Sequence, residues 1–167
     1  MNVNQLLSKE IEARIIECGI HRIIACIEKL HEDHLHYRPN ENSNSINNQV
    51  LHLDGNVRQW LISTMSNTKD SRQRTMEFDP KNRKSKTELI DILNLLEKDI
   101  RDILVNIESI DLTQIQTVQC YTESNLSIIV HVIEHFSYHV GQITYITKML
   151  LDIDTGYYAG QALDRIS

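Results

Sequence analysis

The sequence predicts an all-α protein, a four-helix bundle formed by a single domain that spans residues 1–167. Three observations favour this fold class. Four long segments carry apolar residues at the three- and four-residue spacing of a helix. The chain has only two prolines and five glycines, so few residues interrupt a helix. Its 167 residues are the length of one domain that can bury a core.

The first predicted helix runs from about Val3 to Leu30 and ends at a polar, histidine-rich stretch. The second runs from about Ser45 to Met65, and Asn44 or Ser43 can cap it by accepting a hydrogen bond from a free backbone N–H group. Gly55 lies inside this helix, where glycine costs about 1 kcal/mol relative to alanine. We therefore expect a neighbouring helix to approach closely at Gly55.

The third predicted helix runs from about Lys86 to Ile107 and begins with the capping box Ser85-Lys86-Thr87-Glu88. The fourth, from about Asn125 to Leu151, is apolar on nearly all sides, so we expect it to be the most buried. A short helix is expected in the tail, residues 152–167. The connection over residues 66–84 is much longer than the roughly 2–8 residues that join antiparallel neighbours. This length favours a crossover that leaves the second and third helices parallel, and a surface loop is the simpler alternative.

The net charge of −6 and the absence of a basic run argue against a nucleic-acid partner and against an anionic membrane surface. No stretch approaches the roughly 20 apolar residues of a membrane span, and the first residues do not resemble a signal peptide. The three cysteines, Cys18, Cys26 and Cys120, have no paired metal-binding spacing. Reduced thiols are typical of the cytoplasm, so we expect a cytoplasmic protein.

Three histidines in the fourth predicted helix, His131, His135 and His139, are spaced by four residues. Neighbouring pairs at this spacing share a helix face and can share a metal ion. The outer two lie about 12 Å apart along the axis, so one ion does not take all three. Because a buried ring without a partner costs about 1–3 kcal/mol, these imidazoles need partners in an apolar helix.

A third ligand has to come from another helix, and His52 beside Leu53 is the best candidate. Three protein ligands leave coordination positions open, which is typical of catalytic metal sites. Imidazole suits Zn, Ni, Fe or Cu. The simpler interpretation is that these histidines are hydrogen-bonded core residues, and the spacing alone leaves both interpretations open.

Three passages carry a resemblance to a known family. They are Tyr37-Arg38-Pro39-Asn40 continuing to Val50-Leu51-His52-Leu53, then Arg72 to Phe78, and finally Glu134-His135 with Tyr138-His139 and Gly141-Gln142. Over essentially the whole chain, these passages resemble the DinB-like superfamily of bacterial metal-binding four-helix bundles.

The resemblance implies an up-down-down-up bundle with a long crossover between the second and third helices. It also implies that one divalent metal ion, Zn or Ni first and Fe or Mn as alternatives, is held by three ligands. These metal ligands are His52, His135 and His139. From their positions beside the ligands, His131, Gln142 and Tyr138 are candidates for outer partners that contact the ligands rather than the ion, and a purely structural packing role is the alternative for each. Where many relatives carry a basic residue, this chain has Val140, which weakens any assignment of a specific activity.

Some relatives in the superfamily are similar to thiol-dependent transferases or isomerases. The resemblance therefore implies a metal-dependent thiol S-transferase or hydrolase that acts on a small-molecule substrate, with a low-molecular-weight thiol as a further cofactor. The alternative is a non-catalytic, metal-stabilised bundle that binds a ligand or partner. We also expect a homodimer, because bundles of this size often pair through an exposed apolar helix face.

Five other residues could contribute to the site. Arg72 and Arg74 could bind an anionic substrate if their connection folds over the site, although an exposed charged loop is the simpler interpretation. Glu134 is next to His135 and points about 100° away from it, so a salt bridge or a surface role is favoured over catalysis. Cys120 and Tyr121, which precede the fourth helix, are both candidates for the mouth of the site.

Overall fold

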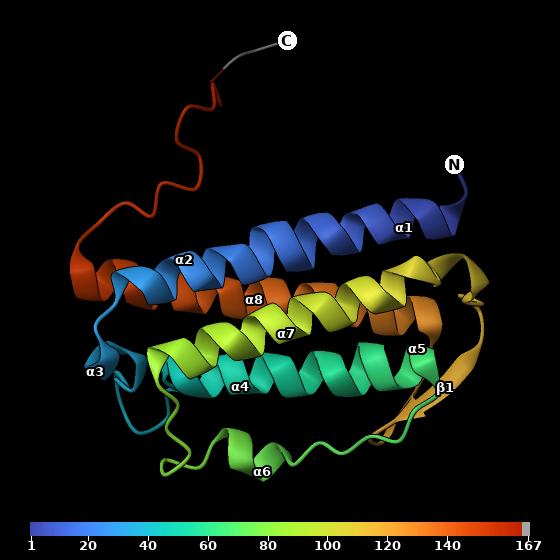
Figure 1. The fold of residues 1–167 in the computed structure, drawn as a ribbon, viewed down its shortest axis with the longest axis horizontal. Helices are drawn as coiled ribbons and strands as arrows, with labels where there is room; N and C mark the ends of the chain where they lie inside the picture. The colour runs from blue at the N-terminus through green and yellow to red at the C-terminus, as the bar shows by residue number, and fades with distance from the viewer. Residues whose placement is uncertain (165–167) are drawn as a thin grey trace.

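The computed structural model describes residues 1–164 and is built around four long helical rods (Figure 1). The first and second rods are each interrupted by a π-helical stretch, whereas the third and fourth are single α-helices. The rods are α1 (Val3–Ile11), η1 (Glu12–Ile20) and α2 (His21–Lys29); α4 (Ile46–Val57), η2 (Arg58–Ser63) and α5 (Thr64–Ser66); α7 (Lys86–Val105); and α8 (Asn125–Leu151).

The rods pack side by side along their lengths. The first rod and α8 run in one direction, while α4 and α7 run in the other (Figure 1). α8 contacts α2, η1 and α4, and α7 contacts α4 and the first rod. The second and third rods are therefore parallel, and the chain returns along the outside of the molecule between them. This return segment carries the short helix α6 (Arg74–Glu77).

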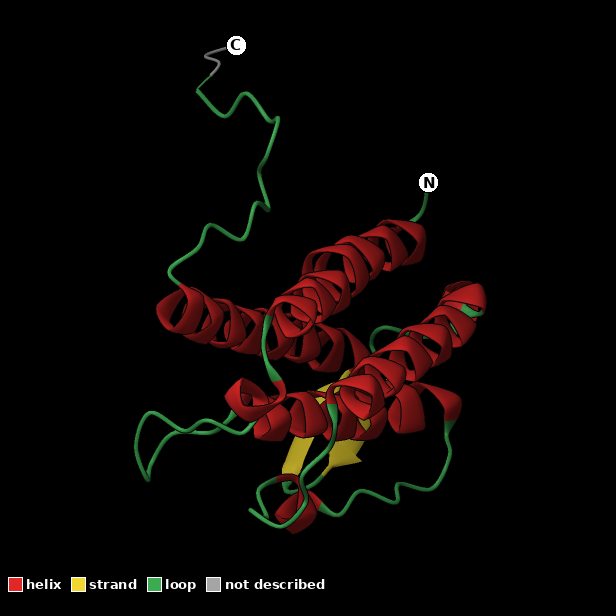
Figure 2. Ribbon diagram, turned by 60° about the vertical axis from the view of Figure 1, so that its left-hand side comes forward, coloured by secondary structure: helices red, strands yellow, loops and turns green. Residues whose placement is uncertain are grey.

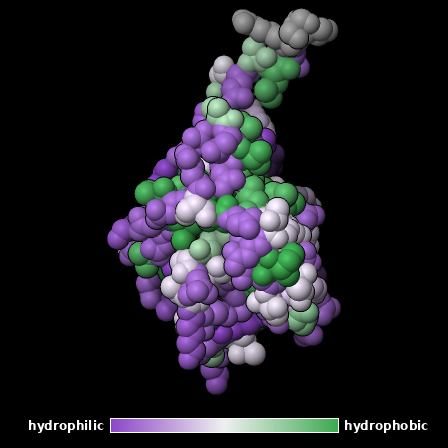
Figure 3. All heavy atoms as spheres, turned by 90° about the vertical axis from the view of Figure 1, so that its right-hand side faces the viewer, coloured by the Kyte–Doolittle hydropathy of each residue, from purple (hydrophilic) through white to green (hydrophobic). Residues whose placement is uncertain are grey.

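The core lies between the rods and consists mainly of isoleucine and leucine. The stripe predicted for the third helix is buried at Leu89, Leu93, Leu96 and Ile100. α8 buries Phe136 and Ile143 among others, but it also leaves several large apolar side chains exposed. The apolar character of α8 is therefore not accounted for by burial within this chain alone. At the end of the rods, apolar side chains form small patches among polar ones (Figure 3).

The all-α prediction is wrong in one respect, because the structure contains a two-stranded antiparallel sheet. Strand β1 (Ile115–Val118) pairs with β2 (Tyr121–Ser124), and the hairpin lies on the same side of the rods as α6 (Figure 2). The β-branched and aromatic residues of these strands favour a sheet. The turn is Gln119-Cys120, with Gln119 at φ 56°, and it lacks the Asn-Gly or Asp-Gly pair that usually marks a hairpin. The remaining short elements are α3 (Glu32–Leu35) and the 3₁₀ turn η3 (Ile107–Ser109).

The helix caps explain where the rods begin. Ser85 accepts from the backbone N–H of Glu88, and the Glu88 side chain accepts in return, so the predicted capping box is confirmed. The second rod is capped by Ser45 and not by Ser43 or Asn44. Ser45 accepts from the Asn48 backbone N–H while the Asn48 side chain accepts from that of Ser45. This reciprocal pair satisfies two backbone donors, which a single cap from either earlier residue would not do.

The tail differs from its prediction. Residues 152–164 contain turns and no helix, and residues 165–167 lie outside the described part of the chain. Gly156 and Gly160 have positive φ values of 75° and 79°, which end any helical run. Tyr157 fixes the start of the tail, because its hydroxyl lies 3.0 Å from both Cys26 Sγ and Thr144 Oγ1. Among residues 1–164, no helix has the length and apolar character to cross a membrane.

Candidate metal centre

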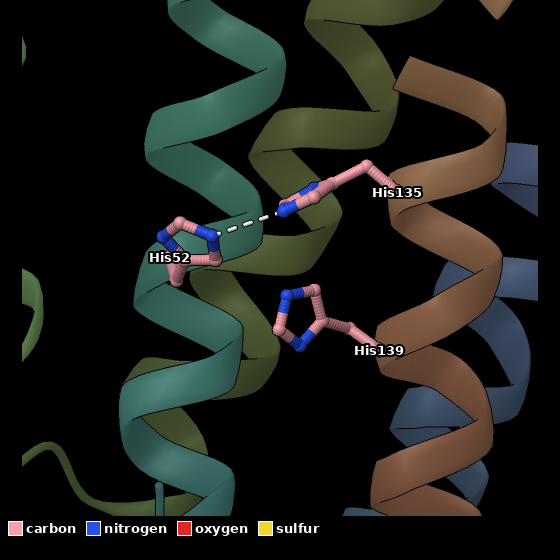
Figure 4. Close-up of side chains that lie close together, drawn as sticks. All are labelled: His52, His135 and His139. Carbon is pink, nitrogen blue, oxygen red and sulfur yellow. Dashed lines mark hydrogen bonds between the residues drawn. The ribbon is translucent and has the colours of Figure 1, made fainter. Parts of the chain in front are cut away.

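Three histidine rings converge between the second rod and α8. His52 projects from α4, while His135 and His139 project from successive turns of α8 toward it (Figure 4). One ring nitrogen from each residue lies within 4.8 Å of the other two. The Nε2 atoms of His52 and His135 are 3.1 Å apart. The spacing of four residues on α8 thus places two rings opposite the one ring of α4.

The ring of His52 is oriented by a buried ion pair. Its Nδ1 lies 2.8 Å from Glu77 Oε2, and Arg72 donates to the two Glu77 oxygens over 2.6 and 2.8 Å. The pKa of Glu77 is lowered and an ionised carboxylate only accepts, so the proton between His52 and Glu77 belongs to Nδ1 of the imidazole. Because Nδ1 carries that proton, Nε2 keeps a lone pair that faces the other two rings.

His139 has a comparable arrangement. Its Nδ1 lies 3.4 Å from Oε1 of the buried Gln49, and its other ring nitrogen points toward His52 and His135 (Figure 4). Nδ1 of His135, by contrast, is buried without a hydrogen-bond partner among the described residues. The His135 ring instead stacks on His131, with centroids 5.6 Å apart.

The two candidate ligands of α8, His135 and His139, are neutral at physiological pH. Burial, followed by the charge of the neighbouring histidines, lowers the pKa of His135 to about 3. Burial and the nearby His52 lower the pKa of His139 to about 4. Burial would raise the pKa of Glu77, but hydrogen bonds from Arg72 and His52 hold it below its ordinary value. The site therefore combines neutral nitrogen donors with a carboxylate that is kept ionised.

This donor set suits a divalent cation. Metal ions bind the neutral imidazole, and the second ring nitrogen of a ligand usually donates to a carboxylate or carbonyl oxygen. His52 and His139 both have such an oxygen in place. Since Nε2 of His52 and Nε2 of His135 face each other, a cation between them would satisfy two lone pairs at once.

The family comparison covers most of the chain. A family model described as "Protein of unknown function (DUF1572)" matches residues 11–157. The chain belongs to the DUF1572 family. No curated protein and no solved structure matches it. The matched segment of this DUF1572 chain includes the three histidines, Gln49 and the Arg72–Glu77 pair.

The three predicted outer partners lie around the histidines of the DUF1572 chain in different ways. The centroid of the His131 ring lies 4.4 Å from that of the Trp60 ring, and the His131 ring stacks on His135. Gln142 lies beside His139, and its hydrogen bond opposes the lowering of that pKa. Tyr138 is 63% exposed and turns a ring edge toward His139, with centroids 5.1 Å apart.

Two residues that orient the histidines were missed by the sequence analysis, Gln49 and Glu77. Gln49 lies one turn before His52 on the same helix, so its position could have been found from helical spacing. Glu77 lies in the return segment, where no periodicity places it. The one local feature of the sequence that pointed to a close contact at this place was Gly55. A Cβ atom there would overlap the Glu77 carboxylate and approach Arg72 within 2.9 Å. Gly55 therefore does allow a close approach, but of this ion pair and not of a neighbouring helix.

Two clefts flank the histidines of the DUF1572 chain. The first, of about 500 Å³, reaches His52 and His135 and is also lined by Trp60, Arg74 and Tyr121. The second, of about 520 Å³, reaches His139 and is lined by residues that include Gln49, Tyr138, Gln142, Tyr145 and Met149. The histidines are thus accessible from two sides.

The return segment is exposed at most of its residues, Arg74 included, but at Arg72 and Glu77 it packs against the site. The Arg72 side chain is only 3% exposed and is held by Glu77, so the simpler interpretation was wrong for this residue. Arg74 lines the first cleft and also packs over Phe78. Glu134 is exposed at the first cleft and forms no salt bridge within residues 1–164, so of its two predicted roles the surface role is the one observed. Tyr121 lines the first cleft, whereas Cys120 is exposed and does not.

Proposed function

We propose that this DUF1572 protein binds one divalent metal ion through Nε2 of His52, His135 and His139, and that it is a metal-dependent enzyme. One observation carries the proposal: three ring nitrogens lie within 4.8 Å of one another. The hydrogen bonds of His52 to Glu77 and of His139 to Gln49 support it, because they turn the free nitrogens inward. Zn²⁺ or Ni²⁺ fits an all-imidazole set best, and Fe²⁺ or Mn²⁺ is the alternative.

The number of ligands supports a catalytic site. Three protein ligands leave at least one coordination position open, as in zinc enzymes. A metal ion bound there lowers the pKa of a coordinated water or thiol, so that a nucleophile forms near neutral pH. The protein would supply the fixed ligands, a buried Arg72–Glu77 pair that keeps His52 in place, and access from the cleft that contains Arg74.

The reaction class rests on the resemblance to the DinB-like superfamily. We place the DUF1572 chain in that superfamily and interpret its four rods as the up-down-down-up bundle. By analogy with thiol-dependent members, the reaction would be transfer of a low-molecular-weight thiol to a small electrophile, or hydrolysis. Arg74, the arginine of the first cleft that is not held by Glu77, would attract an anionic group of the substrate.

A second candidate function is a non-catalytic, metal-stabilised bundle that binds a ligand or partner. The state of Glu77 favours this alternative. It is the one carboxylate hydrogen-bonded to a candidate ligand within residues 1–164, and both of its oxygens are occupied by Arg72 and His52. A carboxylate held in this way is poorly suited to accept a proton from a substrate.

Metal content tests whether the protein binds a metal ion, which both candidate functions require. Protein made without an affinity tag should contain about one equivalent of metal by elemental analysis, or take up one equivalent of Zn²⁺ or Ni²⁺ by titration calorimetry. His135→Ala should lose this binding. His131→Ala is the matched control, because it removes a histidine one turn earlier on α8 and should retain the metal. Wild-type protein that neither contains metal nor takes it up would refute the site.

Activity separates the two functions. The metal-loaded protein should consume a low-molecular-weight thiol in the presence of an electrophile, and His135→Ala should not. If metal stabilises the fold while no thiol transfer or hydrolysis depends on it, the non-catalytic function is the correct one.

A further inference from the structure

The outward face of α8 carries large apolar side chains, interspersed with polar ones, that the other described residues, 1–164, leave exposed. Five large side chains on this face are between 44% and 71% exposed: Leu126, Val130, Tyr138, Tyr145 and Met149. At 100° per residue they fall, together with Gly141, within a sector of about 140°. An exposed apolar stripe on a helix commonly marks an interaction site.

Gly141 lies in the middle of this face and makes room for no neighbour within residues 1–164. Glycine is among the least favourable residues inside a helix, so its presence needs a reason. The two other helical glycines have one. A Cβ atom at Gly19 would lie 2.7 Å from the Phe136 ring, and one at Gly55 would overlap Glu77. A Cβ atom at Gly141 would meet nothing within 4 Å, so the close approach that it permits would have to come from another molecule.

The charges on this face are placed symmetrically about Gly141. Glu134 precedes it by seven residues and Lys148 follows it by seven. Two positions seven residues apart differ by only about 20° in direction around the helix axis, so the three residues form one line along α8. Both charged residues are exposed, and neither forms a salt bridge within residues 1–164. If a second α8 crosses the first in the antiparallel direction at Gly141, Glu134 of each copy lies level with Lys148 of the other.

We propose that α8 pairs antiparallel with α8 of a second copy of this chain, about a two-fold axis at Gly141. The partner is a second copy because an antiparallel α8 places its Lys148 opposite Glu134 and its Glu134 opposite Lys148. A closed two-fold interface requires such a surface, which is complementary to itself. Gly141 lets the two helix axes come close, and Tyr138 and Tyr145 pack on either side of the crossing. Aromatic residues are enriched in such interface centres.

The pairing also affects the site. Val130 and Glu134 form part of the rim of the first cleft, and Tyr138, Tyr145 and Met149 form part of the rim of the second. A second copy bound along α8 therefore narrows the openings of both clefts. The pairing does not depend on the metal, so its test is separate from that of the proposed function.

Sedimentation equilibrium of charge-reversed variants tests the pairing. Wild-type protein at up to about 100 µM should contain dimers, since a weak specific dimer associates at this concentration. Glu134→Lys and Lys148→Glu should each weaken the dimer by at least about tenfold, because two attractive pairs become repulsive. The double variant, which exchanges the two charges, should recover dimerisation to within about threefold of wild type.

Matched controls are available on α7. Asp91→Lys and Lys98→Glu make the same charge changes at exposed positions and should leave the dimer unchanged. Circular dichroism establishes that each variant is folded. A monomeric wild-type protein would overturn the proposal. A dimer that neither single reversal weakens, or one that the double variant does not restore, would overturn it as well.

Discussion

At the scale of single residues, the orientation of His52 depends on Glu77. Replacing Glu77 by glutamine removes the negative charge that accepts from His52 and that pairs with Arg72. The buried guanidinium is then unpaired, which should lower the free energy of unfolding by about 3 kcal/mol. Loss of a ligand's hydrogen-bond partner typically weakens metal binding by about 10- to 100-fold.

Two measurements check the prediction for Glu77→Gln. Urea denaturation of the metal-free protein gives the stability, and competition with a zinc chelator gives the affinity. Glu28→Gln, at an exposed position of α2, is the control and should change neither quantity. Unchanged zinc affinity in Glu77→Gln would show that the carboxylate does not position the ligand.

At the scale of the elements, Gly55 connects α4 to the return segment. Gly55→Ala should gain helix propensity, but its methyl group would displace Glu77 and Arg72. We expect a net loss of about 1–3 kcal/mol of stability together with weaker zinc binding. Gly141→Ala makes the same change in open space, so in dilute, monomeric protein it should raise stability by up to about 1 kcal/mol. If both variants are stabilised alike by thermal and chemical denaturation, the ion pair adapts without cost.

The same elements show what the sequence could predict. The rods were predictable because their apolar spacing and the cap at Ser85 are local features. His135 and His139 were found because a period of four on one helix is local as well, whereas the resemblance was needed to join His52 to them and to leave out His131. The hairpin was missed because Gln119-Cys120 is not a usual turn pair. The contact of Glu77 with His52 was missed because it joins residues 25 positions apart through an irregular segment, whose course depends on tertiary packing.

At the scale of the whole molecule, the neutral histidines couple folding to pH. In the folded, metal-free chain the pKa of His135 is about 3 and that of His139 about 4, whereas an unfolded histidine has a pKa of about 6.5. Below about pH 6.5 the unfolded chain therefore binds more protons than the folded chain. Stability from these groups is fully present above about pH 6.5 and is lost as the pH falls toward the folded pKa values.

Denaturation of the metal-free protein between pH 7.5 and pH 5 should therefore show a loss of about 3 kcal/mol. A double variant, His135→Gln with His139→Gln, should lose much less over the same range, because it removes both titrating rings. Saturating Zn²⁺ should raise the stability of wild type at pH 7.5, and most of this gain should persist at pH 5, since the folded rings of His135 and His139 stay neutral there and protons do not yet compete with the metal. Equal pH dependence in wild type and the double variant would mean that other groups govern the loss. A zinc effect of the same size in the double variant would place the metal on ligands other than these histidines.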